Sequence, residues 1–149
     1  MLSGDAAIRN VVLALELAPN PAVVNGDRVQ LEQVVLNLLI NAMEATAEVS
    51  DGDRTVIVRS EANGDNAIHV AVQDAGTGLV AGVQEWIFEP FFTTKSTGMG
   101  MGLSIAKSII EAHGGAIWAT NNPARGATFH FSLPELAKHP ASVVSAAGH

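Results

Sequence analysis

The stretch FEPFFTTKSTGMGMGLSIAK, residues 88–107, changes character along its length. It opens with aromatic residues around a proline and passes through threonines and a lysine. Glycine then occupies every second position, at Gly98, Gly100 and Gly102, before apolar residues recur at helical spacing. We therefore predict a glycine-rich segment followed directly by an amphipathic helix over residues 101–113. The first turn of such a helix exposes free N–H groups, and glycines let phosphate oxygens reach them.

The composition of the whole chain excludes several classes of protein. Its 149 residues are 48% hydrophobic and 15% charged, which is typical of one packed globular domain. The net charge of −7 and the scattered lysines and arginines argue against a nucleic-acid surface. Cysteine is absent, and no apolar run approaches the ~20 residues of a membrane span. We expect a cytoplasmic domain over residues 1–135, without direct membrane contact, and a disordered tail over residues 136–149.

Periodicity outside the opening stretch predicts the remaining elements. Asp27 has the character of a helix N-cap, with Gln30 three residues later in the manner of a capping box. The helix that follows should end near Ala47, with a core stripe formed by Leu31, Val34, Val35, Leu38, Ala42 and Ala45. We further predict a strand over 11–17, an antiparallel hairpin of 55–61 with 67–74, a short helix at 80–86 within a long loop, and closing strands over 116–121 and 127–133.

Three polar residues of the first long helix share one stripe beside its apolar face. Asn37, Asn41 and Glu44 lie at spacings of four and three residues. Two interpretations are open at this point. The amides can cap neighbouring backbone groups, or the oxygens can bind a hard cation such as Mg²⁺ that shares ligands with phosphates.

Asp74 follows a strand whose residues alternate between apolar and other side chains. It has the parity of the apolar row, so the strand directs a carboxylate toward the core. One interpretation is that Asp74 merely begins a turn with Gly76. The other is that it accepts a hydrogen bond from an exocyclic amine, with Gly76 and Gly78 letting a flat ring approach the backbone.

The remaining candidates are a lone cation and the histidines. Lys95 precedes the glycines and is able to reach a phosphate, although a solvated side chain is the simpler interpretation. His69, His113, His130, His139 and His149 show no metal-ligand or triad spacing, so we expect structural roles for all five.

Four segments in order resemble one family. NLLINAMEA (37–45), DAGTGL (74–79), IFEPFFTTK (87–95) and GMGMGLSIAKSIIEAHGG (98–115) are similar to the N, G1, F and G2 boxes of the catalytic domain of sensor histidine kinases. That domain belongs to the GHKL ATP-binding superfamily, and the form of the third segment resembles the nitrogen-regulating and oxygen-sensing kinases. The resemblance implies an α/β two-layer sandwich, the Bergerat fold, with helices on one face of a mixed β-sheet.

The resemblance also implies roles for individual residues. Asn41 corresponds to the Mg²⁺ ligand, Asn37 lies toward the phosphates with a catalytic role shared by Lys95, and Asp74 binds the adenine amino group of ATP. The further residues expected to contact the nucleotide, several of them in a lid, are Glu44, Gly76, Gly78, Phe88, Thr94, Lys95, Gly98, Gly100, Gly102 and Leu103.

Two departures from the family pattern limit this transfer. Many members have Thr directly after the glycine of the closing strand, whereas here Ala127 follows Gly126 and Thr128 comes one residue later, with the opposite parity. No histidine stands in a phosphoacceptor context. The resemblance therefore implies transfer of the γ-phosphoryl group to a histidine on a separate dimerisation domain, and then to a response regulator; whether the parent protein is membrane-anchored stays open.

The superfamily also contains ATPases, which place a glutamate one turn before the metal-binding asparagine. Asn37 occupies that position here, and an amide cannot take a proton from water, so kinase chemistry is favoured. A serine kinase of the anti-sigma-factor type and a nucleotide-binding regulatory module without transfer activity are the alternatives.

Overall fold

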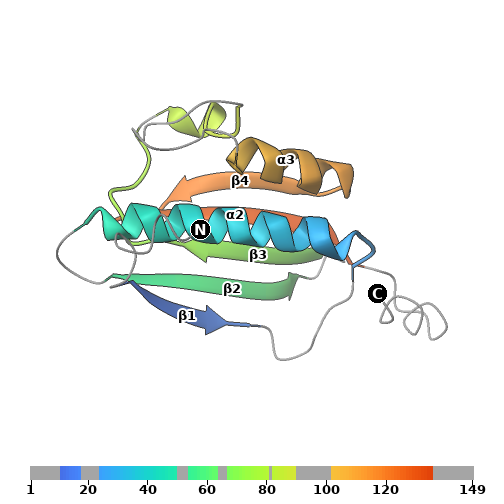
Figure 1. Ribbon diagram of the computed structural model, residues 1–149, viewed down its shortest axis with the longest axis horizontal. Coiled ribbons are helices and arrows are strands. Elements are labelled where there is room, and N and C mark those ends of the chain that lie inside the picture. Colours follow the sequence, from blue (N-terminus) through green and yellow to red (C-terminus); the bar gives the residue numbers. More distant parts are fainter. Residues whose placement is uncertain are drawn as a thin grey trace.

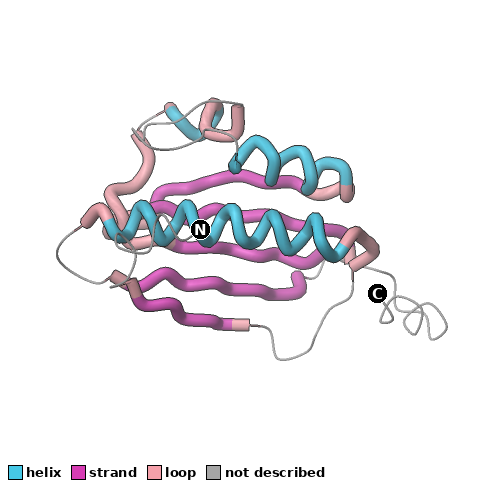
Figure 2. Tube along the Cα trace, viewed as in Figure 1, coloured by secondary structure: helices cyan, strands magenta, loops and turns pink. Residues whose placement is uncertain are grey.

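The computed structural model describes residues 11–17, 24–49, 54–63, 67–80, 82–89 and 102–135. Figures 1 and 2 show one layer of strands with helices packed on one side of it. The elements, in chain order, are β1 (Val12–Glu16), α2 (Arg28–Ala47), β2 (Thr55–Asn63), β3 (Ala67–Gln73), the 3-10 helix η2 (Val83–Glu85), α3 (Gly102–Ala112), β4 (Ala116–Asn121) and β5 (Ala127–Pro134).

The sheet is mixed, with the strand order β1-β2-β3-β5-β4. β1 runs parallel to β2, and the other neighbouring pairs are antiparallel. β2 and β3 form the predicted hairpin, in which Val58 lies opposite Val72. Helices α2 and α3 both lie on one face of this sheet (Figure 1), so the predicted two-layer α/β class is confirmed.

Helix α2 begins and ends where the sequence predicts. The Asp27 side chain accepts a hydrogen bond from the backbone N–H of Gln30 at 3.0 Å, which satisfies a donor of the first turn. Its fully buried residues recur every four positions, at Val34, Leu38, Ala42 and Thr46. Val34, Leu38 and Ala42 of the predicted stripe are therefore confirmed as buried, and Leu31 and Val35 pack against the core. Thr46 extends the stripe, although the hydrophobic pattern did not include it.

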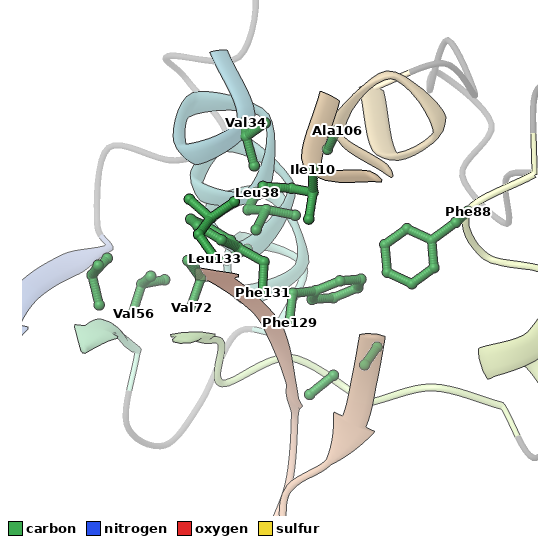
Figure 3. Close-up of a cluster of buried hydrophobic side chains, with 14 residues drawn as sticks. Val34, Leu38, Val56, Val72, Phe88, Ala106, Ile110, Phe129, Phe131 and Leu133 are labelled. Atoms are coloured by element: carbon green, nitrogen blue, oxygen red, sulfur yellow. The ribbon is translucent and has the colours of Figure 1, made fainter. Parts of the chain in front are cut away.

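The core lies between the helices and the central strands. Phe129, Phe131 and Leu133 of β5 point toward α2 and α3, where they meet residues such as Leu38 and Ile110 (Figure 3). Strand β5 is the most buried strand, with Ala127, Thr128, Phe129, Phe131 and Leu133 all buried. Burial of one such large apolar side chain stabilises the fold by about 1.5–3 kcal/mol relative to exposure.

One connection differs in detail from the prediction, and another agrees with it. The short helix expected at 80–86 is a single 3-10 turn over Val83–Glu85. Helix α3 ends with Gly114 at a φ of 79°, the left-handed conformation that commonly follows a helix, as expected from the Gly-Gly pair. The predicted tail and the segment 90–101 lie outside the described residues.

Candidate functional site

Asp74 lies directly after β3 and is 3% exposed. Its Oδ1 accepts hydrogen bonds from the backbone N–H groups of Gly76 at 3.0 Å and Ala127 at 2.9 Å. Its own N–H donates to the carbonyl of Ala127 at 2.8 Å. The interpretation that Asp74 begins a turn with Gly76 is therefore confirmed, and its carboxylate is buried with backbone donors as partners. Its contact with an exocyclic amine stays a prediction.

Two glycines allow the backbone to close around Asp74. Gly126 has a φ of 89°, and a Cβ there would lie 2.3 Å from the carbonyl oxygen of Asp74. A Cβ at Gly76 would lie 2.7 Å from the carbonyl oxygen of Ala45 at the end of α2. Neither position accommodates a side chain, so the turn after β3, the end of α2 and the start of β5 are packed in backbone contact.

A second group of polar contacts supports this turn from the β4–β5 connection. Asn122 donates through Nδ2 to the carbonyl of Asp74 at 3.0 Å, and Thr128 donates through Oγ1 to Asn122 Oδ1. Arg125 Nε donates to the carbonyl of Ala75 at 2.9 Å. Thr128 lies opposite Gln73, on the parity row that the sequence indicated. The hydrogen bonds that link Thr128 to Asp74 therefore run through the side chain of Asn122.

Helix α2 connects this turn to the start of α3. Thr46 Oγ1 accepts from the N–H of Ala75 at 3.0 Å. Nine residues earlier, Asn37 Nδ2 donates to the carbonyl of Gly102 at 3.0 Å, and Asn37 Oδ1 accepts from Gln33 Nε2 at 2.7 Å. The two contact points are roughly 13 Å apart along the helix at 1.5 Å per residue.

Asn41 and Glu44 are half-buried on α2, between these two contact points. The interpretation that an amide of this stripe caps neighbouring backbone is confirmed for Asn37, which binds the first residue of α3. A metal-ligand role for Asn41 stays a prediction. Within the described ranges, no group of three or more histidine, aspartate or glutamate residues is arranged to hold a metal ion.

The other predicted site residues fall into two groups. Phe88 is buried and packs edge-on against Phe129, with ring centroids 6.1 Å apart, and Leu103 packs against the core. Their described contacts are therefore with the core, and contact with a nucleotide stays a prediction for both. Thr94, Lys95, Gly98 and Gly100 lie outside the described residues.

Sequence reasoning missed four residues that build the site. Thr46, Asn122 and Arg125 support the turn at Asp74 as described above. Asn121 holds both backbone groups of Leu79, accepting from its N–H at 2.7 Å and donating to its carbonyl at 3.1 Å. The run NNPARG (121–126), which connects the last two strands, is rich in turn-forming and polar residues. This composition could have indicated Asn121, Asn122 and Arg125 as residues that support the site.

Comparison with known proteins agrees with this arrangement. The family model described as histidine kinase-, DNA gyrase B- and HSP90-like ATPase matches residues 26–137. The sensor protein FixL of Bradyrhizobium diazoefficiens is 48% identical over 126 residues, which are 85% of this chain and 25% of FixL.

The chain belongs to the histidine kinase-, DNA gyrase B- and HSP90-like ATPase family.

Solved structures place it with the sensor kinases of this family. The catalytic domain of the histidine kinase ThkA superposes with a TM-score of 0.72 at 37% identity, covering 90% of this chain and 86% of that domain. ThkA in complex with the response regulator TrrA gives a TM-score of 0.71 at 33% identity, covering 91% of this chain and 38% of that one. The chain is thus a catalytic ATPase domain of the sensor histidine kinase type.

The family domain is only part of the relatives that it resembles. The matched part of this chain spans about a quarter of the length of FixL. The chain is also 40% identical over 134 residues to the sensor histidine kinase ZraS of Klebsiella oxytoca, and it covers 28% of that protein. Within the part of the chain that the structure describes, no helix is long and apolar enough to cross a membrane.

Proposed function

We propose that this domain binds Mg-ATP and donates its γ-phosphoryl group to a histidine on a separate helical dimerisation domain. The observation that carries the proposal is the buried carboxylate of Asp74 within a turn where glycine backbone approaches closely. Such a group accepts a hydrogen bond from an exocyclic amine such as that of adenine, and the glycines of the turn let a flat ring approach the backbone.

The part of the α2 stripe near Asn37, farthest from the Asp74 turn, is suited to binding the phosphates of ATP. Asn37 and Asn41 lie toward the start of α3, where Gly102 and Leu103 belong to the first helical turn. N–H groups of a first turn have no partner within the helix and favour anions. Amide oxygens such as that of Asn41 suit Mg²⁺, which neutralises phosphate charge when it is bound.

The chemistry of Asn37 favours transfer over hydrolysis. Its amide cannot act as a general base, and it is already engaged by Gln33 and the carbonyl of Gly102. The domain therefore positions ATP without activating water, and the phosphoryl group requires a nucleophile held in line by another domain.

The proposed partners follow from this division of roles. A histidine-bearing dimerisation domain receives the phosphoryl group, and a response regulator receives it next. The complex of the related kinase ThkA with its response regulator TrrA supports the second partner by similarity. This domain lies in the cytoplasm, as part of a parent protein that is either soluble or anchored in a membrane.

Calorimetry of Asp74→Asn tests nucleotide binding. Asparagine keeps an oxygen for the N–H groups of Gly76 and Ala127, so the fold should persist. Loss of the charge-assisted bond should cost about 1.5–3 kcal/mol, or roughly 10–150-fold in affinity for ATP. Asp27→Asn, which keeps the α2 cap at the opposite end of the helix, should bind like the parent chain. Unchanged affinity in a folded Asp74→Asn chain would refute the adenine assignment.

A further inference from the structure

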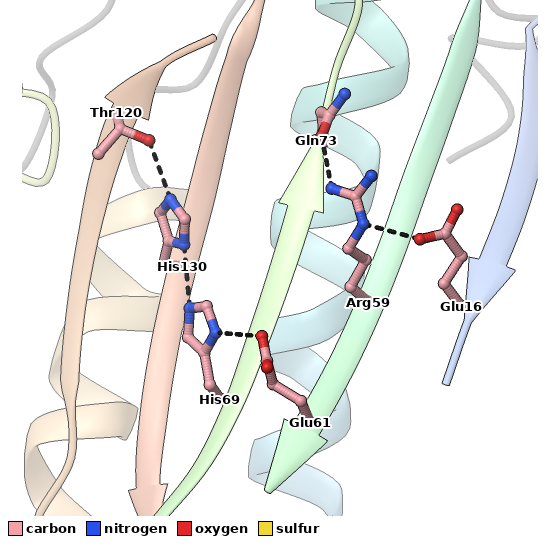
Figure 4. A network of polar contacts seen from close by, with 7 residues as sticks. All are labelled: Glu16, Arg59, Glu61, His69, Gln73, Thr120 and His130. Atoms are coloured by element: carbon pink, nitrogen blue, oxygen red, sulfur yellow. Dashed lines mark hydrogen bonds and ion pairs between the residues drawn. The ribbon is translucent and has the colours of Figure 1, made fainter. Parts of the chain in front are cut away.

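The face of the sheet turned away from α2 and α3 carries a group of aromatic rings. His69 of β3, His130 of β5 and Trp118 of β4 alternate along their strands with residues of the core. Figure 4 shows both histidines on the side of the sheet opposite the helices. Trp118 lies opposite His130 across the β4–β5 pair and is 38% exposed.

The two histidines meet through their ring nitrogens. His69 Nε2 and His130 Nδ1 are 3.0 Å apart, and the two ring planes differ by 10°. The indole of Trp118 is parallel to both imidazoles, with centroid distances of 5.2 Å to His130 and 5.7 Å to His69. One of these nitrogens donates its proton to the in-plane lone pair of the other, so both nitrogens face the same space.

We propose that His69 and His130 form a binding site for a borderline divalent transition-metal ion such as Zn²⁺, Ni²⁺ or Cu²⁺, in which the ion replaces the proton that the two imidazoles share. Bonds of about 2.0–2.1 Å at angles of about 90–109° place neighbouring nitrogen ligands about 2.8–3.4 Å apart. The separation of 3.0 Å lies within this range.

The opposite nitrogen of each ring has the partner expected around a metal ligand. His69 Nδ1 lies 3.5 Å from Glu61 Oε1, and His130 Nε2 lies 2.9 Å from Thr120 Oγ1. Carboxylates and hydroxyls in such positions orient a ligating imidazole and raise its basicity. The neighbouring cation on this face, Arg59, is already paired with Glu16 at 2.8 Å.

The two imidazole ligands favour a borderline metal ion over a hard one such as Mg²⁺. Two imidazole nitrogens suit Zn²⁺, Ni²⁺ and Cu²⁺, whereas Mg²⁺ prefers oxygen. The described residues supply two ligands, so water completes the coordination on the exposed side. The site joins β3 to β5 and is separate from the proposed nucleotide site on the other face.

The test uses Trp118 as the reporter. In the full chain with Trp86→Phe, the remaining tryptophan contacts both imidazoles, so Ni²⁺ should quench its fluorescence with a saturable curve, and excess Mg²⁺ should not compete. Zn²⁺ should displace Ni²⁺ and raise the thermal midpoint. His139→Ala and His149→Ala in the same background exclude binding by histidines of the C-terminal segment and should leave the curve unchanged.

Two sets of variants decide the assignment. His69→Gln with His130→Gln should abolish saturable quenching while circular dichroism shows a folded chain. Glu61→Gln alters an exposed side chain and should weaken Ni²⁺ binding by about 10–100-fold, the usual effect of removing a group that orients a ligand. No saturable quenching in the parent background, or equal quenching in the folded double variant, overturns the proposal. If the double variant does not fold, Glu61→Gln still tests the proposal, because unchanged Ni²⁺ affinity in that variant counts against the metal site.

Discussion

At the scale of single residues, Asp74 joins three segments that are distant in the sequence. Its Oδ1 binds the turn after β3 and the start of β5, while Asn122 holds its carbonyl group. The glycine at 126 is required by this arrangement, because any Cβ there would collide with Asp74. The position of one carboxylate is therefore fixed by backbone and side-chain groups from three separate segments of the chain.

Gly102 differs from these glycines, and this difference leads to a prediction. A Cβ at Gly102 would meet Asn37 only at 3.9 Å, an ordinary contact, and the residue lies in a helix where alanine is preferred. Gly102→Ala should leave the unfolding free energy unchanged or raise it by up to about 1 kcal/mol. If phosphates approach this backbone, affinity for ATP should fall by about tenfold, the equivalent of one hydrogen bond to a charged group.

Denaturant unfolding and calorimetry on the same Gly102→Ala preparation separate the two effects. Ser108→Ala, at an exposed position of the same helix, is the matched control and should change neither quantity appreciably. A Gly102→Ala chain that binds ATP as well as the parent would show that phosphates do not approach α3 at this point.

Asn41→Ala tests the metal role. An amide ligand of Mg²⁺ contributes to binding only when the metal is present, so affinity for ATP with Mg²⁺ should fall by about 10–100-fold. Affinity for nucleotide in the presence of a chelator should change little. Isothermal titration under both conditions gives the comparison, with Gln30→Ala on the exposed side of α2 as control. Equal losses with and without Mg²⁺ would rule out a ligand role.

At the scale of elements, a histidine links the beginning of α2 to the end of α3. The N–H of Asp27 donates to His113 Nε2 at 3.0 Å, and His113 Nδ1 lies 2.7 Å from the carbonyl of Ile109. Nδ1 therefore carries the proton, and Nε2 accepts. The capping-box expectation was half correct: Asp27 caps the N–H of Gln30, but His113 binds the N–H of Asp27.

His113→Ala should therefore lower the unfolding free energy by about 0.5–1.5 kcal/mol, the usual net contribution of one hydrogen bond. Denaturant unfolding measures the change, and Glu111→Ala on the exposed surface near the end of α3 is the control, expected within about 0.5 kcal/mol of the parent. Indistinguishable midpoints for the two variants would show that the link between the helices does not contribute to stability.

The elements were largely predictable because their signals are local. Alternating apolar residues indicated β3, and Asp27 followed by apolar residues at helical spacing indicated α2. The burial of Asp74 followed from parity along one strand. The roles of Asn122, Thr46 and His113 did not follow, because each depends on contact between segments that only the tertiary fold brings together. The contact between His69 and His130 likewise arises from strand order, since 61 residues separate them.

At the scale of the whole molecule, the sheet separates two kinds of surface. The helical face carries the α2 stripe and the Asp74 turn, which contacts the end of α2. The opposite face carries the two imidazoles (Figure 4), with the Trp118 ring parallel to both. Every described histidine is engaged by another group, and none lies in a phosphoacceptor context. This agrees with the proposal that the domain binds and positions ATP for a nucleophile on another domain.

Incubation of this chain with ATP labelled in the γ-phosphoryl group, with and without the cognate dimerisation domain as a separate chain, tests the central claim most directly. The account predicts negligible label on the chain itself, slow phosphate release, and acid-labile label on the added domain that disappears when its acceptor histidine is replaced by glutamine. Rapid phosphate release from the chain alone, or acid-stable label on a serine, would contradict it.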